Sequence, residues 1–130
     1  MVITGDGELL MNLGSLAAIA TVAPPNLSII CLDNGCHGET GGQPGHTSHR
    51  TNLEMMAQAA GFPATMTIET EEALPAGRAF LTSAAGPRFI QVRVSNGPPT
   101  AYKRNLDPAE CRSRFRSAYL SKAVPQPGPA

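Results

Sequence analysis

Two polar clusters near the start of the chain could together bind a metal ion and a phosphate group. The first is Asp6, which stands between Gly5 and Gly7. Its carboxylate can reach a divalent cation, while the glycines leave backbone N–H groups open to a phosphate. The second is Asp33-Asn34, which follows an apolar, strand-like run and can supply a further oxygen ligand. The spaced pair predicts a phosphate and metal site more strongly than either cluster alone.

The elements that must position these clusters alternate along the chain. Apolar, strand-like runs are found at residues 1–4, 27–32, 65–68 and 89–94. Helical patterns are found at residues 9–21, 52–60, 71–81 and 107–120. This alternation predicts an α/β protein, a three-layer α/β/α sandwich with a mainly parallel sheet. Ligands bind at the carboxyl edge of such sheets, which is where both polar clusters fall.

A long polar loop, residues 34–50, follows the second cluster. It has no periodicity and is longer than most compact connections, so it is typical of a lid or a binding loop. Its histidines, His37, His46 and His49, could relay a proton, and we favour His37 and His46 as catalytic candidates. For each histidine the alternative is a solvated loop rich in turn-forming residues.

Composition restricts the partners and the compartment. The 10 basic and 10 acidic residues cancel, which argues against nucleic acid or an anionic membrane surface as the partner. The apolar stretch 9–32 is long enough to span a membrane. Because two prolines interrupt it, we do not expect a membrane-spanning helix there. Three cysteines without a secretory signal favour reduced thiols in a cytoplasmic protein. A zinc site of Cys31, Cys36 and His37 fits poorly, because Cys31 would point into the core.

Residues 1–42 resemble the diphosphate-binding motif of thiamine diphosphate enzymes. In that family a Gly-Asp-Gly is followed, one crossover later, by an Asn pair or Asp-Asn, and residues 8–32 fill the interval here. Resemblance to one branch, the sulfopyruvate and phosphonopyruvate decarboxylases, lies in the runs LDNGCHGETGGQPGHTSH, TNLEMMAQAAGF and GPRFIQVRV. Within that branch the chain most resembles the separate β subunit of sulfopyruvate decarboxylase, nearly throughout, up to Leu120.

The resemblance implies that the chain holds thiamine diphosphate and Mg²⁺. The implied metal ligands are the side chains of Asp6 and Asn34 and the backbone carbonyl of Cys36. The implied cofactor contacts are Gly5, Asp6, Gly7, Glu8, Leu9, Asn34, Cys36, Gly38, Glu39 and Thr40. Glu8 and Leu9 would contribute backbone N–H groups, so their side chains need not matter.

The reaction implied by the resemblance is the non-oxidative decarboxylation of a small anionic 2-oxoacid to an aldehyde. The sequence departs from the family in two ways. His37 stands where family members often carry an aromatic residue. The glutamate that activates the cofactor belongs to a pyrimidine-binding domain, and nothing here corresponds to that domain. We therefore expect a pyrimidine-domain partner subunit and a hetero-oligomer. The alternatives are half of an acetolactate-synthase-like carboligase and a non-catalytic, truncated remnant.

The same resemblance assigns residues 1–122 to the diphosphate-binding domain and residues 123–130 to a Pro-rich disordered tail. Family domains carry a strand-helix-strand region before the Gly-Asp-Gly strand, so the fold is expected to be incomplete at its N-terminal edge. Val2 and Ile3 should then lie exposed at the edge of the sheet.

Overall fold

The computed structural model of the chain describes residues 1–97 and 105–123. It divides into two units, Met1–Gly97 and Pro98–Ala130, and the second contains helix α5 (Pro108–Ala123). The carboxylate of Asp107 accepts hydrogen bonds from the N–H groups of Ala109 and Glu110, which explains where α5 begins. The expected tail falls mostly on residues 124–130, which lie outside the described part, so the domain boundary stays a prediction.

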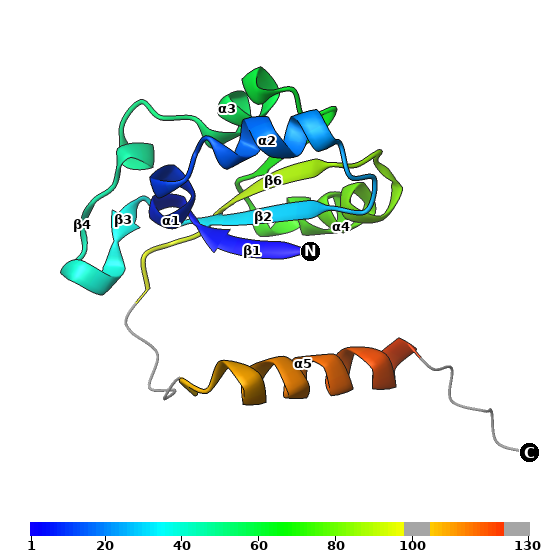
Figure 1. Cartoon of the computed structure of the whole chain (residues 1–130). Coiled ribbons are helices and arrows are strands. Elements are labelled where there is room, and N and C mark those ends of the chain that lie inside the picture. The colour runs from blue at the N-terminus through cyan, green and yellow to red at the C-terminus, as the bar shows by residue number, and fades with distance from the viewer. Residues whose placement is uncertain (98–104, 124–130) are drawn as a thin grey trace, which may run out of the picture. The chain divides into compact units, whose positions relative to one another are not determined.

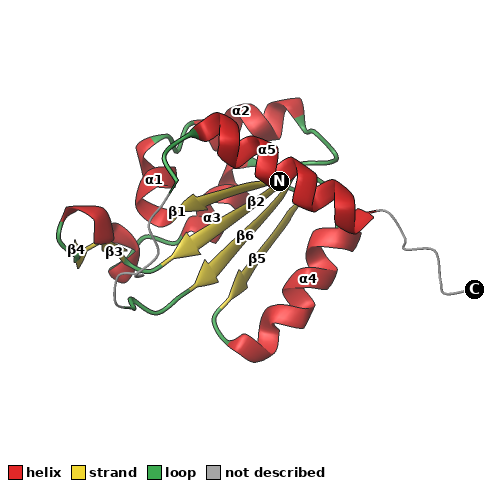
Figure 2. Ribbon diagram, turned by 90° about the horizontal axis from the view of Figure 1, so that it is seen from below, coloured by secondary structure: helices red, strands yellow, loops and turns green. Residues whose placement is uncertain are grey.

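A parallel, four-stranded sheet with the strand order β1-β2-β6-β5 forms the centre of the first unit (Figures 1 and 2). Its strands are β1 (Val2–Gly5), β2 (Ser28–Asp33), β5 (Ala64–Ile68) and β6 (Arg88–Arg93). Val2 and Ile3 in β1 and the run from Ile29 to Leu32 in β2 are apolar, as is typical of strands in a parallel sheet. Gly5 pairs with Leu32, so Asp6 and Asp33, the residues that follow, emerge at the same edge.

Helices cover both faces of the sheet, which confirms the predicted three-layer sandwich (Figure 2). The helices of this unit are α1 (Asp6–Met11), α2 (Ser15–Val22), α3 (Leu53–Ala60) and α4 (Leu74–Ser83). The first three pack on one face and bury an apolar core. Its members are Leu9, Leu16, Ile29, Cys31, Leu53, Ala57, Phe62 and Phe89. On the other face, α4 approaches Ile68 and Ile90 so closely that Gly77 has no room for a Cβ.

The prediction of one helix over residues 9–21 is wrong. Helix α1 begins at Asp6 and ends at Met11, and α2 begins at Ser15. Asn12 and Gly14 lie in the break, and both residue types are poor in helix interiors. The Glu8 carboxylate accepts hydrogen bonds from the N–H of Gly5 and the hydroxyl of Thr4, so this side chain stabilises the start of α1.

The pattern at residues 71–81 also divides, into a 3₁₀ turn, η3 (Glu71–Ala73), and the helix α4. Pro75 lies in the first turn of α4, where its missing N–H costs no hydrogen bond. Strand β1 forms one edge of the sheet, and Val2 and Ile3 are 47% and 59% exposed there, as predicted. Among the described residues, none of the helices combines the length and the apolarity that a membrane crossing needs.

Candidate functional site

The carboxyl edge of the sheet brings two buried carboxylates onto one hydroxyl group. Asp6 is 3% exposed and Asp33 is 1% exposed. Thr47, far along the chain from Asp6, inserts its side chain between them. Its Oγ1 lies 2.9 Å from Asp6 Oδ2 and 2.7 Å from Asp33 Oδ1. Asp6 is the first residue of α1, and the N-cap position belongs to Gly5, so Asp6 does not serve as a helix cap.

Two further groups donate hydrogen bonds to Asp33, the N–H of Gly35 at 3.0 Å and Nε2 of Gln91 at 2.5 Å. Nη1 of Arg93 forms an ion pair with Asp33 Oδ2 at 3.1 Å. The same Nη1 of Arg93 donates to the carbonyl of Thr47 at 3.2 Å. Two carboxylates therefore face one guanidinium group in this cluster, which leaves one formal negative charge at the edge of the sheet. A divalent cation would complement that charge.

Two glycines allow close packing around Asp6. A Cβ at Gly45 would lie 3.3 Å from Asp6 Oδ2 and 3.2 Å from the carbonyl of Gly35. A Cβ at Gly7 would lie 3.2 Å from His37 Nδ1. A side chain at Gly45 would crowd Asp6 and Gly35, and one at Gly7 would crowd the His37 ring.

The Asn34 side chain stabilises a local turn. Its Oδ1 accepts a hydrogen bond from the N–H of Cys36 at 3.1 Å. An amide oxygen has two lone pairs, so this bond leaves Oδ1 able to accept a cation as well. Turn formation and metal ligation are therefore compatible at Asn34.

The loop after Asn34 contains a small hairpin and two 3₁₀ turns (Figure 1). Their bounds are β3 (Cys36–His37), η1 (Gly38–Thr40), β4 (Gln43–Pro44) and η2 (His46–Ser48). The hairpin brings two catalytic candidates together, because the rings of His37 and His46 meet edge to face with centroids 6.4 Å apart. Glu39 and Thr40 lie on the exposed η1 turn, and His49 is exposed.

Cys31 does not behave as a metal ligand. Its side chain is fully buried in the core under the site. Burial, and then the carboxylates of Asp33, Asp6 and Glu8, raise the pKa of Cys31 to about 12, so the thiol stays protonated. Within residues 1–97 and 105–123, no three His, Cys, Asp or Glu side chains gather as metal ligands. The zinc alternative therefore has no support here, whereas the magnesium set uses an amide and a backbone carbonyl besides one carboxylate.

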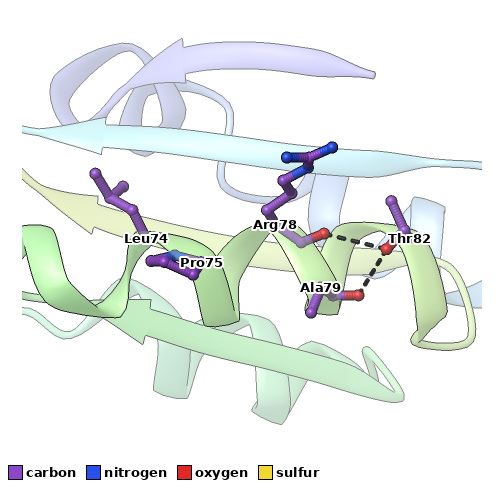
Figure 3. Close-up of a pocket in the computed structure, with 5 residues that line it drawn as sticks. All are labelled: Leu74, Pro75, Arg78, Ala79 and Thr82. Carbon is purple, nitrogen blue, oxygen red and sulfur yellow. Dashed lines mark hydrogen bonds between the residues drawn. The ribbon is translucent and has the colours of Figure 1, made fainter.

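A separate groove lies along α4, on the other face of the sheet, and measures about 590 Å³. Leu74, Pro75, Arg78, Ala79 and Thr82 line it (Figure 3). Arg78 also borders an adjoining apolar cavity of about 440 Å³ against β2 and β6. Among these five residues only Arg78 is ionisable, so the groove offers no acid-base pair.

Sequence reasoning missed Thr47, Gln91 and Arg93. One signal was available for Gln91 and Arg93: along β6 they share the side of Phe89, and polar residues among buried ones indicate a polar network. Thr47 had no such signal, because it lies in a loop of polar residues.

Comparison with known proteins identifies the domain type. Residues 1–92 match the family described as thiamine pyrophosphate enzyme, C-terminal TPP binding domain. A sulfopyruvate decarboxylase subunit beta from Methanocaldococcus jannaschii is 44% identical over 72 residues, which cover 55% of this chain and 38% of that protein. A phosphonopyruvate decarboxylase from Streptomyces hygroscopicus is 38% identical over 117 residues, 89% of this chain and 29% of that protein.

A further sulfopyruvate decarboxylase subunit beta, from Methanococcus maripaludis, is 32% identical over 116 residues. These residues cover 89% of this chain and 62% of that protein. The chain thus spans less than two thirds of the length of each of these relatives.

Proposed function

Because the chain belongs to the thiamine pyrophosphate enzymes, as their C-terminal TPP-binding domain, we propose that it holds the Mg²⁺-diphosphate end of thiamine diphosphate in a 2-oxoacid decarboxylase. The observation that carries this proposal is the buried cluster at the carboxyl edge, where Asp6 and Asp33 exceed the positive charge of Arg93 by one. The net negative charge of this cluster would attract a cation.

The residues present fit that group. Mg²⁺ prefers oxygen ligands, and Asp6, Asn34 and the carbonyl of Cys36 offer a carboxylate, an amide and a peptide oxygen. Gly7 has no side chain of its own between the start of α1 and a diphosphate, although the His37 ring lies against it. The backbone of Glu8 and Leu9, and the residues Gly38, Glu39 and Thr40 of the hairpin, would complete the cofactor contacts.

Bound thiamine diphosphate supplies the electron sink for decarboxylation. The chain's own residues would fix its position and transfer a proton. His37 and His46 are the candidates for the proton transfer, and their rings contact each other edge to face. The packing of the His37 ring against Gly7 favours a position for His37 beside the diphosphate. His46 is then the candidate for the proton that completes the aldehyde.

The substrate class and the partner follow from the relatives. They carry the names sulfopyruvate decarboxylase and phosphonopyruvate decarboxylase, so we propose a small anionic 2-oxoacid as substrate. Two of them are named as beta subunits, which supports assembly with an alpha-type subunit in a hetero-oligomer. That partner would contribute the pyrimidine-binding domain and the glutamate that activates the cofactor.

Calorimetry of the 130-residue chain with thiamine diphosphate and Mg²⁺ tests the binding role. We expect Mg²⁺-dependent binding that Asp6→Asn abolishes, since the amide removes the charge of the main ligand at nearly constant size. Glu71→Gln, the same change in an exposed turn on another loop, should leave binding unchanged. Undiminished binding by Asp6→Asn would exclude the metal assignment.

The catalytic role is tested by assembly. The chain alone should release no carbon dioxide from sulfopyruvate or phosphonopyruvate, because binding of the diphosphate end by itself does not activate the cofactor. Addition of a pyrimidine-domain subunit should start the reaction. In that assembly His46→Gln should lower kcat about 100-fold or more, while His37→Gln should mainly weaken cofactor binding. Turnover by the isolated chain would contradict the half-site proposal, and an acetohydroxy acid as product would favour the carboligase alternative.

A further inference from the structure

The hydroxyl of Thr47 serves two carboxylates with one proton. Both carboxylates are buried, and Thr47 itself is 3% exposed. A hydroxyl group donates one hydrogen bond, and ionised carboxylates can only accept. At any moment, therefore, Thr47 donates fully to Asp6 or to Asp33, or shares its proton weakly between them. The two carboxylates that Thr47 contacts therefore share one hydrogen-bond donor where each could use its own.

The two carboxylates do not depend on this proton equally. Asp33 accepts two hydrogen bonds besides that of Thr47, from Gly35 and Gln91, and forms an ion pair with Arg93. For the Asp6 side chain, Thr47 is the one hydrogen-bond donor within the described residues. The orientation of the Asp6 carboxylate thus rests on a residue 41 positions away in the sequence.

Thr47 also fixes the turn to which it belongs. Its carbonyl accepts from Arg93 at 3.2 Å, and the N–H of Gly45 donates to the carbonyl of Gly35 at 2.7 Å. The η2 turn is therefore tied to the sheet edge through Thr47 on one side and Gly45 on the other. His46 lies between these two tethers, so whatever holds Thr47 also holds the backbone of His46.

We propose that Thr47 is a positioning residue for Asp6, and that its single hydroxyl proton couples cation binding at Asp6 to the order of the η2 turn. This inference rests on the proposed function and deepens it. A cation on Asp6 offsets the repulsion between the two carboxylates and relieves the donor shortage. The Thr47 side chain is then held more firmly. By thermodynamic linkage, a Thr47 side chain that is already held firmly raises the affinity of the site for the cation.

The test compares Thr47→Val, which removes the hydroxyl at nearly constant volume, with Thr47→Ser, which retains it. The probe is Mn²⁺ alone, followed by the electron paramagnetic resonance of the free ion with the full chain. We expect Thr47→Val to weaken Mn²⁺ binding about tenfold or more, the usual effect of losing a partner of a metal ligand. Thr47→Ser should restore the affinity to within about threefold. Thr82→Val removes an exposed hydroxyl from α4 (Figure 3) and should have no effect.

Hydrogen exchange supplies a readout that a merely structural role would not move. Mg²⁺ should slow the exchange of the amides of residues 45–49 in the wild-type chain and in Thr47→Ser, and should leave them unchanged in Thr47→Val. Equal Mn²⁺ affinity in Thr47→Val and wild type would overturn the proposal, as would wild-type exchange that ignores Mg²⁺. The wild-type result decides the matter even if Thr47→Val does not fold.

Asp6→Asn separates the two levels of inference. If Asp6→Asn binds Mn²⁺ as well as wild type does, the metal assignment itself fails. If Asp6→Asn loses Mn²⁺ while Thr47→Val retains it, the metal assignment stands and only the coupling through Thr47 fails.

Discussion

The two halves of the segment between β2 and α3 are similar in composition but opposite in construction. Residues 36–44 form a hairpin that bonds to itself, for example from the N–H of Gly42 to the carbonyl of His37 at 2.9 Å. Residues 45–48 bond to the sheet edge, through Gly45 and Thr47, both of which are buried. Polar, glycine-rich sequence thus forms an exposed flap in one half and part of the buried site in the other.

The difference shows how a lid can be attached to a fixed site. The hydrogen bonds across the hairpin do not involve the groups around Asp33, so its movement would leave that network intact, whereas movement of η2 would expose buried charge. The lid predicted for the whole loop is therefore best sought in residues 38–44, with His46 on the side that stays in place.

The largest effect is expected from Arg93→Met, which removes the positive charge from the anchored half. Asp33 would keep other hydrogen-bond donors but lose its counter-charge. Because the Arg93 side chain is 36% exposed, we expect a loss of about 2 kcal/mol in unfolding free energy, below the value for a fully buried pair. Urea denaturation measures it. As a control, Arg112→Met makes the same change on exposed α5, and its unfolding free energy should stay within about 0.5 kcal/mol of wild type. Equal losses of unfolding free energy in both variants would show that Arg93 makes no specific stabilising contact.

Limited proteolysis should separate the halves directly. A protease of broad specificity should cut residues 38–44 at least about tenfold faster than residues 46–49, since only the second cut requires opening of the buried network. Thiamine diphosphate with Mg²⁺ and a substrate analogue should slow the first cut if the hairpin closes over the cofactor. Equal cutting of the two halves would refute the division.

Gly45→Ala should cause a smaller loss, about 1 kcal/mol in unfolding free energy. Gly45 has φ −81°, which any residue adopts, so the cost comes only from the new Cβ at 3.2 to 3.3 Å from Gly35 and Asp6. Gly14→Ala is the matched control, because its Cβ would meet no atom within 4 Å. Thermal unfolding of the two variants suffices, and a stabilised Gly45→Ala would contradict the close packing.

The smallest perturbation is chemical labelling of the two cysteines near the site. Cys36, in the hairpin, is partly exposed and should react with iodoacetamide at about pH 8.5. Cys31 is fully buried and its pKa is raised to about 12, so it should react only after unfolding. The raised pKa also means that stability falls as pH rises above 9.0, the ordinary thiol value, because the unfolded chain then loses a proton that the folded chain keeps. Mass spectrometry of native and unfolded samples gives both extents; early modification of Cys31 would show that the core under the site opens.

Local patterns determined most of the fold. The alternation of apolar runs with helical periods was enough to predict the parallel sandwich. The family and the exposed edge at β1 followed instead from the resemblance of the chain to thiamine diphosphate enzymes. The boundary between α1 and α2 was missed because the apolar residues continue through Asn12 and Gly14, and periodicity outweighed helix propensity in the prediction.

Only the tertiary structure decided which residues surround Asp6. The contacts of Thr47 with Asp6, of Gln91 with Asp33 and of Arg93 with Thr47 join segments 41, 58 and 46 positions apart. Local propensity carries no information about such pairs, because each polar residue would serve equally well in solvent. The sheet order places β6 beside β2, and the η2 turn then closes over their carboxyl ends. The cost of burying a carboxylate without partners is what selects this arrangement.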